Sequence, residues 1–391
     1  MPQHAHPAEE MHHLLSREIN ELYWSLALSN FSVGLVGLFV PIYMFQYFGG
    51  SFVAVFTFYI VQSIAQTILI PFSARLLHVW GLKKLIAIGR VFLAVYLMSL
   101  MLLGSFPGIT FIVIATVAKI IFLITTPLAL HTDFAKFTSG KKRGRQVSGA
   151  HIVTVLSRAA APLIGGYIIV SLGYAPVYIV ATMLLIISTA PLFFSEETYE
   201  HFSLNWGQSF ARVFAKKNLR TSFAFFCEGA ENVAGIFLFP IFLFLVIGKI
   251  DTLGWVTSLS LSLTFFISYF VGWITDKKGG RSVMSFTSVA HAFSWVVNAF
   301  IVTPFQFIVF SSFYRLAATG NRLPMTTLFY ENAQKRGHGV DEYVVFHEIA
   351  HNLGRIFIFS VFIIGFAMGY TSFMFYFVLV GLAALLYRLM R

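Results

Sequence analysis

Apolar segments alternate with short polar ones along most of the chain. A helix needs about 20 predominantly apolar residues to cross a bilayer. Six segments of about that length precede a polar central stretch and six follow it: 22–46, 52–77, 85–103, 109–130, 147–171 and 175–194, then 222–247, 253–275, 282–302, 305–329, 346–368 and 372–389. The pattern predicts an all-α membrane protein of twelve transmembrane helices, with an N-terminal six-helix bundle over 22–194 and a C-terminal one over 222–391.

Two longer polar segments lie outside these bundles. Residues 1–21 are rich in histidine and contain no apolar signal region, so we expect a polar, disordered cytoplasmic tail there. Metal binding by its histidines is the alternative, and we expect no metal site. Residues 195–221 interleave aromatic and basic side chains, for example Trp206, Phe210, Arg212 and Lys216. This pattern is typical of an amphipathic helix on a membrane surface, and it predicts a cytoplasmic linker between the two bundles.

Composition and charge agree with a membrane protein. Hydrophobic residues make up 58% of the chain and charged residues 11%, whereas soluble domains carry roughly 25% charged residues. The net charge is +11, but the basic residues gather in every second loop, and Lys249 alone lies in the opposite loops. This bias places both termini in the cytoplasm, with the protein in a plasma (inner) membrane, and it explains the charge without a nucleic-acid partner. The single cysteine, Cys227, excludes an intrachain disulfide.

An internal repeat relates the two bundles. Residues 272–281 form a charged, glycine-bounded segment between two apolar ones, and a degraded copy occurs at 74–84. Gly81 matches Gly279 in these copies, and Arg158 matches Arg355 at nearly the same offset. Such a series indicates a duplicated unit, which is the arrangement expected of a transporter with its site between the repeats. Arg158 and Arg355 lie near the cytoplasmic ends of paired segments, so we expect them to be gate or interface residues, with snorkelling to the headgroups as the alternative.

The segment 272–281 resembles the loop motif of the major facilitator superfamily, G-x-x-x-D-R/K-x-G-x-R/K. The matching residues are Gly272, Asp276, Lys277, Gly279 and Arg281. The resemblance implies that family's fold, two pseudo-symmetric six-helix bundles around a central cavity, with alternating access by rocking. It also implies that this segment is a conformational latch outside the substrate site. The first copy keeps Gly81, but His78 stands in place of the aspartate, so we expect a weaker latch there.

A second motif lies in the segment 147–171. Pro162, Gly165 and Gly166 are similar to the end of the family's antiporter motif, G-x-x-x-G-P-x-x-G-G. Small residues let two helices approach closely, so plain helix packing explains the same residues. The resemblance slightly favours export over uptake.

Several ionisable or polar residues lie inside the apolar segments. Such groups are costly in a membrane, so they usually face a cavity or one another. Glu228 and Glu231 are three residues apart and share a helix face; Asn30 is the repeat counterpart of Glu228, and Lys119 and Arg315 lie midway along their segments. We expect the two glutamates to couple protons to transport, with Lys119 and Arg315 as counter-charges or anchors for an anionic group. The alternative is a structural ion pair that locks the bundles.

One further motif points to a different class of protein. His347, Glu348 and His351 match H-E-x-x-H, with both histidines on one helix face as zinc catalysis requires. However, position 357, where the extended motif has its third ligand, is phenylalanine. An intramembrane zinc hydrolase is therefore a minor alternative, and a polar gate helix is favoured.

Together these patterns predict a secondary active transporter, and not an enzyme, that moves a small organic solute by alternating access. We expect protons as the coupling ion, export slightly favoured, a lipid bilayer as the surroundings, no cofactor and a monomer. Transport of a lipid-like amphiphile is the alternative within the same class.

Overall fold

The computed structural model describes the backbone of residues 7–104, 108–137, 143–194, 196–278, 280–335 and 339–390. Within these ranges it describes all side chains except those of 7–19, 136–137, 143–148, 265–270, 272–273, 275–276, 278, 280–281 and 334–335. Helix accounts for 87% of the chain, and the described ranges contain no strand. The predicted all-α fold is confirmed.

The helices form two groups on either side of a central linker. The first group consists of α1 (Pro7–Gly37), α2 (Phe39–Tyr47), α3 (Phe52–Ser73), α4 (Leu76–Trp80), α5 (Leu82–Leu102), α6 (Gly108–Phe137), α7 (Arg143–Ala159), α8 (Ala161–Leu172), α9 (Tyr174–Ile187) and the short 3₁₀-helix η1 (Ala190–Phe193). The linker carries α10 (Trp206–Phe214). The second group consists of α11 (Leu219–Val233), the π-helical turn η2 (Ala234–Leu238), α12 (Phe239–Ile247), α13 (Ile250–Lys278), α14 (Gly280–Asn298), α15 (Pro304–Lys335), α16 (Val340–Ala367), α17 (Phe373–Leu385) and the short 3₁₀-helix η4 (Leu386–Leu389).

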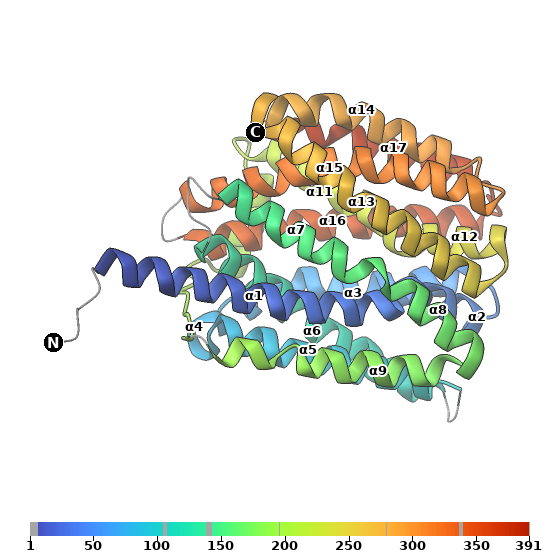
Figure 1. Cartoon of the computed structure of the whole chain (residues 1–391), viewed down its shortest axis with the longest axis horizontal. Helices are drawn as coiled ribbons and strands as arrows, with labels where there is room; N and C mark the ends of the chain where they lie inside the picture. Colours follow the sequence, from blue (N-terminus) through green and yellow to red (C-terminus); the bar gives the residue numbers. More distant parts are fainter. Residues whose placement is uncertain are drawn as a thin grey trace.

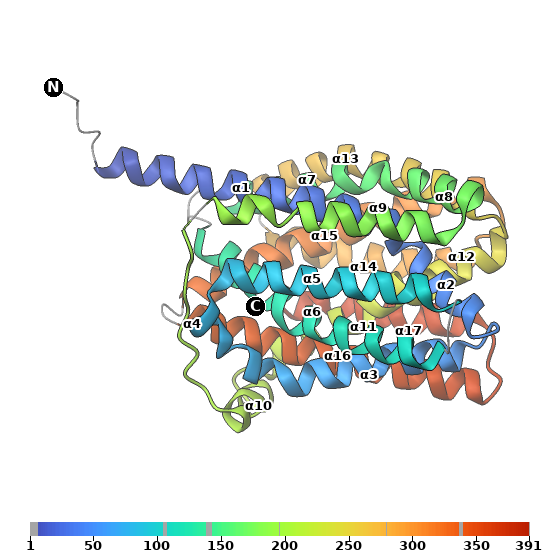
Figure 2. The same ribbon diagram turned by 90° about the horizontal axis from the view of Figure 1, so that it is seen from below.

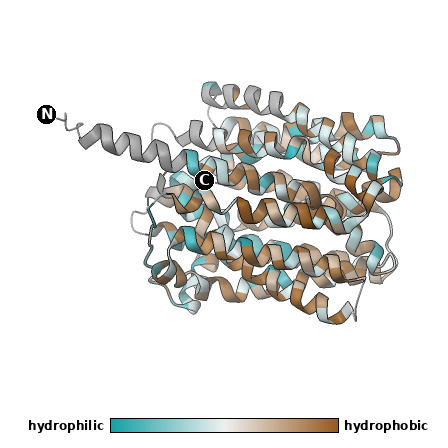
Figure 3. Cartoon of the chain, turned by 60° about the horizontal axis from the view of Figure 1, so that its bottom comes forward, coloured by the Kyte–Doolittle hydropathy of each residue, from teal (hydrophilic) through white to brown (hydrophobic). Residues whose placement is uncertain are grey.

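The long helices run roughly side by side, so the molecule has two ends (Figure 1). We name them the α4 end, where α4 and α10 lie, and the α2 end, where α2 and α12 lie (Figures 1 and 2). Apolar residues predominate along the helices between these ends (Figure 3). This distribution suits helices surrounded by lipid, because apolar side chains can face hydrocarbon while the backbone polar groups bond within each helix.

Eight described helices are long and apolar enough to cross a membrane. They include α3, α5, α6 and α16, and several combine two helical elements, such as Asn20–Tyr47 and Leu219–Ile247. The predicted segments 253–275, 282–302 and 305–329 coincide with α13, α14 and α15, and 372–389 with α17 and η4. The count of twelve membrane spans stays a prediction.

Local chemistry sets several helix boundaries. Ser51 begins α3 as its N-cap, because its side-chain oxygen accepts a hydrogen bond from the backbone N–H of Ala54 at 3.2 Å. Gly81 separates α4 from α5 with a φ of +81°, and Gly173 separates α8 from α9 with a φ of +86°. Glycine adopts this left-handed region without the clash that a Cβ would cause.

The structure differs from the sequence predictions in three places. Helix α1 begins at Pro7, so the part of the predicted disordered tail from residue 7 onwards is helical. The predicted segment 147–171 is divided at Ala160, where α8 starts afresh with Pro162 in its first turn, because proline has no N–H to continue the preceding helix. The linker is helical only over α10, and the residues from 196 to 205 before it are not helical.

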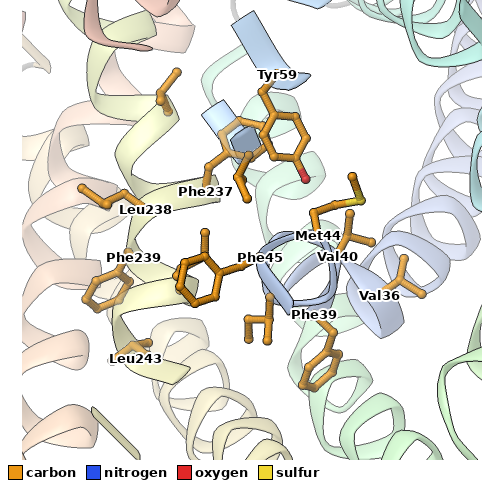
Figure 4. Close-up of a cluster of buried hydrophobic side chains, with 14 of the residues drawn as sticks. Val36, Phe39, Val40, Met44, Phe45, Tyr59, Phe237, Leu238, Phe239 and Leu243 are labelled. Atoms are coloured by element: carbon orange, nitrogen blue, oxygen red, sulfur yellow. The ribbon is translucent and has the colours of Figure 1, made fainter. Parts of the chain in front are cut away.

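Helices of the first group pack directly against helices of the second group. Helix α3 contacts α16, α7 and α8 contact α13, and α2 contacts α12. Towards the α2 end, an aromatic cluster joins the groups: Tyr59 of α3 lies 4.1 Å from Phe237 of η2 between ring centroids, and Phe52 lies 4.1 Å from Phe366. Figure 4 shows Tyr59 and Phe237 side by side within a larger buried apolar cluster. Such pairs contribute about 0.5–1.5 kcal/mol each beyond their area burial.

Candidate functional site

A cavity of about 280 Å³ lies between the two groups of helices. The first group supplies lining residues from α3 and α6, and the second from α11, α15 and α16. The complete lining is Gln66, Leu123, Pro127, His131, Phe225, Glu228, Asn232, Met325, Thr326, Phe329, His347, Glu348, His351 and Arg355. Three histidines, two glutamates and one arginine therefore share one small space.

Contacts between the groups lie on both sides of this cavity along the helix axes. Towards the α2 end is the aromatic cluster around Tyr59 and Phe237. Towards the α4 end, Phe134 of α6 lies 5.1 Å from Tyr330 of α15 between ring centroids, and the Tyr330 hydroxyl hydrogen-bonds Nδ1 of His131 at 2.9 Å. The cavity thus lies between two layers of contact, each made of side chains from both groups.

Helix α16 supplies the largest polar share of the lining. His347, His351 and Arg355 are spaced four residues apart, which puts them above one another on one face of the helix. Glu348 follows His347 directly and also reaches the cavity. A rise of 1.5 Å per residue separates His347 from Arg355 by about 12 Å along the helix axis.

His347 lies between two carboxylates. Its Nε2 donates a hydrogen bond to Oε2 of Glu228 on α11 at 3.2 Å, and its Nδ1 lies 3.4 Å from Oε1 of Glu348. The side chain of Glu348 is only 6% exposed, while 24% of the Glu228 side chain is accessible. An imidazole between two acids can hold a proton that both acids stabilise, so this cluster can take up and release protons within the cavity.

The first group of helices reaches the same cluster. Nε2 of Gln66 on α3 donates to Oε2 of Glu348 at 3.3 Å and to the carbonyl oxygen of Leu123 at 3.2 Å. The charge on Glu348 therefore bears directly on a contact between the two groups.

Glu231, the other predicted proton-coupling residue, lies elsewhere. It is completely buried and accepts hydrogen bonds from Arg322 Nη2 at 2.6 Å, from Tyr314 Oη at 2.8 Å and from Tyr387 Oη at 3.0 Å. Nε2 of His291 lies 3.4 Å from it. All these partners belong to the second group of helices. The structure separates Glu228 and Glu231 into two environments although they are one helical turn apart.

The other predicted site residues are dispersed. The amide of Asn30 bonds the carbonyl of Leu26 and the Thr154 hydroxyl within the first group. The Nε of Arg315 donates to the Ser260 hydroxyl at 2.9 Å. Nζ of Lys119 lies over the rings of Tyr96 and Phe122, 5.0 Å and 4.6 Å from their centroids.

The antiporter-like residues lie at the contact of α8 with α13. A Cβ on Gly254 of α13 would meet the carbonyl oxygen of Pro162 at 2.5 Å and the Cα of Gly166 at 3.4 Å. Gly165 faces the carbonyl of Leu35 on α1 instead. These small residues permit a close crossing of helices from the two groups, as the packing interpretation predicts.

Of the predicted latch, only the first copy is fully described. In the second copy, Gly272, Asp276, Gly279 and Arg281 lie outside the residues whose side-chain surroundings are described, and Lys277 is exposed. In the first copy, the ring of His78 meets that of His201 in the linker edge to face at 5.0 Å. A Cβ at Gly81 would collide with the side chain of Glu197.

The predicted gate arginines differ in their surroundings. Arg158 of α7 is exposed, and Arg355 lines the cavity. The Arg355 guanidinium lies over the ring of Phe237, 5.9 Å from its centroid. The structure thus brings Glu228 and Arg355 to one cavity, and it does not bring Asn30 or Arg315 there.

The residues of the H-E-x-x-H motif, His347, Glu348 and His351, line this cavity. Among the described residues, no group of three histidine, cysteine, aspartate or glutamate side chains is placed to hold a metal ion. Phe357, at the position of the third ligand, is 53% exposed.

Sequence reasoning missed His131 and Arg322. His131 lies just beyond the predicted segment 109–130, so it did not count as a residue inside the membrane. Arg322 lies seven residues after Arg315 on α15, that is, two turns along nearly the same face. This spacing was the available signal, because a second intramembrane arginine on that face is a natural partner for a buried glutamate.

Comparisons with known proteins agree with this architecture. The model of the Major Facilitator Superfamily matches residues 22–340. A comparison with curated proteins finds no match.

Among solved structures, the human organic anion transporter MFSD10 (TETRAN) is 11% identical, with 95% of this chain and 99% of that chain covered and a TM-score of 0.69. FucP, a superfamily transporter in the outward conformation, is 12% identical, with 95% and 96% covered and a TM-score of 0.66. A structure of the E. coli fucose:proton symporter FucP is 12% identical, with 95% of this chain and 97% of that chain covered and a TM-score of 0.64. At these identities the likeness shows the fold, and the family match covers most of the sequence. The chain therefore belongs to the Major Facilitator Superfamily and is a multi-pass membrane transporter.

Proposed function

We propose that this transporter moves a small organic solute by proton-coupled alternating access, with the cavity as its substrate site. The observation that carries the proposal is the position of His347 between Glu228 and Glu348, in the space that both groups of helices line. The volume of the cavity is about 280 Å³. Such a volume favours a small solute over a lipid-like amphiphile.

Proton occupancy of the cluster bears on the contact between the groups. The charged and polar side chains that face His347 are Glu228 on α11, Glu348 and His351 on α16, and His131 on α6. Hydrogen bonds to a charged acceptor are roughly twice as strong as neutral ones. A proton that moves onto Glu348 would therefore weaken the bond from Gln66 of the first group.

A solute can shift this equilibrium only through different affinities for the two states of the transporter. Because the cavity lies between the groups, opening on either side removes one group's contacts from a bound solute. Solute binding and the Gln66–Glu348 contact therefore act on the same movement, and their coupling is reciprocal.

We assign Glu231 a structural role, which is the alternative that the sequence leaves open. Its hydrogen bonds from Arg322, Tyr314 and Tyr387 lie within one group of helices, so rocking of the groups does not require them to break.

The direction that we propose is export, and the α4 end is proposed to face the cytoplasm. Export rests on the resemblance of Pro162, Gly165 and Gly166 to the antiporter motif and on their place at the contact of α8 with α13. The orientation rests on the basic residues at the α4 end, which include Arg75, Lys83, Lys84, Arg212 and Lys216.

Proton flux into proteoliposomes tests the proposal. Vesicles with a trapped pH-sensitive dye would receive the purified chain and then sugars, carboxylates or amines one at a time. We expect at least one solute to move protons, and we expect Glu228→Gln and His347→Gln to abolish that movement. Asp251→Asn, which removes an exposed acid at the start of α13, is the matched control and should behave as the unmodified chain. Proton movement that persists in both cavity variants with unchanged pH dependence would show that the assignment is wrong.

A further inference from the structure

Two cations, Lys119 and Arg355, have neither a carboxylate within ion-pair distance nor a hydrogen-bond partner among the described residues. Lys119 makes cation–π contacts with Tyr96 and Phe122. Arg355 makes one with Phe237, and its buried Nε has no hydrogen-bond partner. Three other arginines differ: the Arg90 guanidinium bonds the Ser25 hydroxyl and the Ser188 carbonyl, Nε of Arg315 donates to the Ser260 hydroxyl, and Arg322 bonds Glu231.

The two cations come from different groups of helices and lie within electrostatic reach of each other. Lys119 on α6 is one turn before Leu123, which lines the cavity, and Arg355 lines it directly. Like charges held together in an apolar interior repel each other and are poorly solvated, so they are normally paired with an opposite charge. Aromatic faces provide only part of that compensation. An anion that lies between them would supply the rest.

The acids of the cavity form no ion pair with these cations. Glu228 and Glu348 lie on either side of His347, and His347 is about 12 Å from Arg355 along α16. The cavity therefore has an acidic end at Glu228 and Glu348 and a basic end at Arg355. The lining also includes the apolar side chains of Leu123, Pro127, Phe225, Met325 and Phe329, of which Phe225 and Phe329 lie against His347.

We infer that the cavity binds a small organic acid, with its carboxylate between Lys119 and Arg355 and its apolar part along α6 and α15. The inference rests on the proposed use of the cavity as the substrate site and adds the chemical class of the substrate. A guanidinium presents a planar fork of donors that suits a carboxylate, and a lysine ammonium adds a point charge. Because the two cations belong to different groups, the ligand would draw the groups together around itself.

Thermal unfolding of the purified full chain tests the inference, because a ligand that binds the folded state raises its stability. The probes are benzoate, hexanoate and 3-phenylpropionate at millimolar concentration, each beside its uncharged amide. We expect at least one carboxylate to raise the unfolding temperature and its amide not to. In Lys119→Gln and in Arg355→Gln, the Kd of that carboxylate should rise by about tenfold or more, which corresponds to about 1.4 kcal/mol.

Three further variants separate binding from folding. Lys249→Gln removes an exposed cation at the α2 end and should leave the Kd unchanged, and Arg355→Lys should retain part of the affinity. Without ligand, Lys119→Gln should unfold at the same or a higher temperature, because it removes one of two unpaired like charges. A lower unliganded unfolding temperature in Lys119→Gln would indicate a structural role for the pair and overturn the inference.

The inference is also overturned if no carboxylate binds, if the amides bind equally well, or if binding survives in a variant that combines Lys119→Gln with Arg355→Gln. The proton-flux assay separates a failure of this inference from a failure of the proposed function. Carboxylate binding without proton movement would contradict proton coupling and support the anion site. Proton movement with sugars or amines alone would support proton coupling and contradict the anion site.

Discussion

Glu231→Gln should destabilise the second group of helices, whereas Glu228→Gln should change coupling with little effect on stability. Both substitutions remove one carboxylate charge from α11 with almost no change in shape, so they form a matched pair. The contrast follows from their surroundings. Glu231 is fully buried with three hydrogen-bond donors. Among the described residues Glu228 has one hydrogen-bond partner, His347, and its side chain is partly accessible.

The magnitude follows from what the substitution leaves behind. Removing one member of a buried ion pair typically costs about 3–5 kcal/mol, because the other charge stays buried without a partner. Here 41% of the Arg322 side chain is accessible, so part of its charge can be solvated again. In addition, the NH₂ group of the introduced amide would face donors that the carboxylate of Glu231 satisfies. We therefore expect a loss of about 2–3 kcal/mol for Glu231→Gln, and about 1 kcal/mol or less for Glu228→Gln.

Unfolding in mixed micelles of SDS and a mild detergent measures both losses. Trp295 is a local reporter, since its buried ring lies 5.1 Å from that of Tyr314, and circular dichroism follows the helices as a whole. In a double-mutant cycle, Arg322→Met should restore part of the stability lost in Glu231→Gln, because it removes the stranded cation. Equal losses in Glu228→Gln and Glu231→Gln, or a Glu231→Gln chain that folds normally but moves no protons, would refute the structural role.

Three further predictions concern contacts other than those of Glu228 and Glu231. Gly254→Leu should force α13 away from Pro162 and lower the free energy of unfolding by about 1–3 kcal/mol. Thermal unfolding with and without lipid would measure this loss. An unchanged unfolding temperature would contradict the close packing. Tyr330→Phe should lose the hydrogen bond to His131 at 2.9 Å, worth about 0.5–1.5 kcal/mol, and should therefore favour opening at the α4 end. Spin labels on the two groups of helices at that end would measure the distance between the groups. A distance distribution equal to that of the unmodified chain would contradict this prediction. Glu197→Gln should weaken the cap of α5, where the Glu197 carboxylate accepts hydrogen bonds from the backbone N–H groups of Lys83 and Lys84 at 2.8 and 3.1 Å. We expect the free energy of unfolding to fall by about 0.3–1 kcal/mol. An equal loss in the neighbouring control Glu196→Gln would argue against capping.

The apolar pattern predicted the elements well because helices in a membrane satisfy their own backbone within each segment. The ends were less predictable. The predicted tail becomes the start of α1 at Pro7, and the segment around Ala160 divides into α7 and α8. The linker prediction placed one helix over the whole stretch, but the segment before α10 bonds α5 through Glu197 and Thr198. That partner is more than 100 residues away, and local amphipathicity contains no information about it.

In the candidate site, too, the sequence predicted local properties but not the contacts between distant residues. The sequence marked Glu228 as a candidate because a carboxylate inside an apolar segment is costly, and it marked Arg355 as a gate residue through the internal repeat. It assigned H-E-x-x-H to a separate and minor hypothesis, because nothing in the pattern indicates that α11 and α16 are neighbours. His347 and Glu228 are 119 residues apart, and Gln66 and Glu348 are 282 residues apart.

The sequence by itself determined the helical segments, the family and the list of buried charged residues, because hydrophobic length and motif spacing are local properties. Only the tertiary structure decided which charges meet. A spacing of three residues puts two side chains on one helix face but about 60° apart around the axis, at 100° per residue. That angle is enough for Glu228 to reach His347 across the cavity while Glu231 bonds Arg322 within the second group. The helices that pack against α11 therefore set the partners of each glutamate.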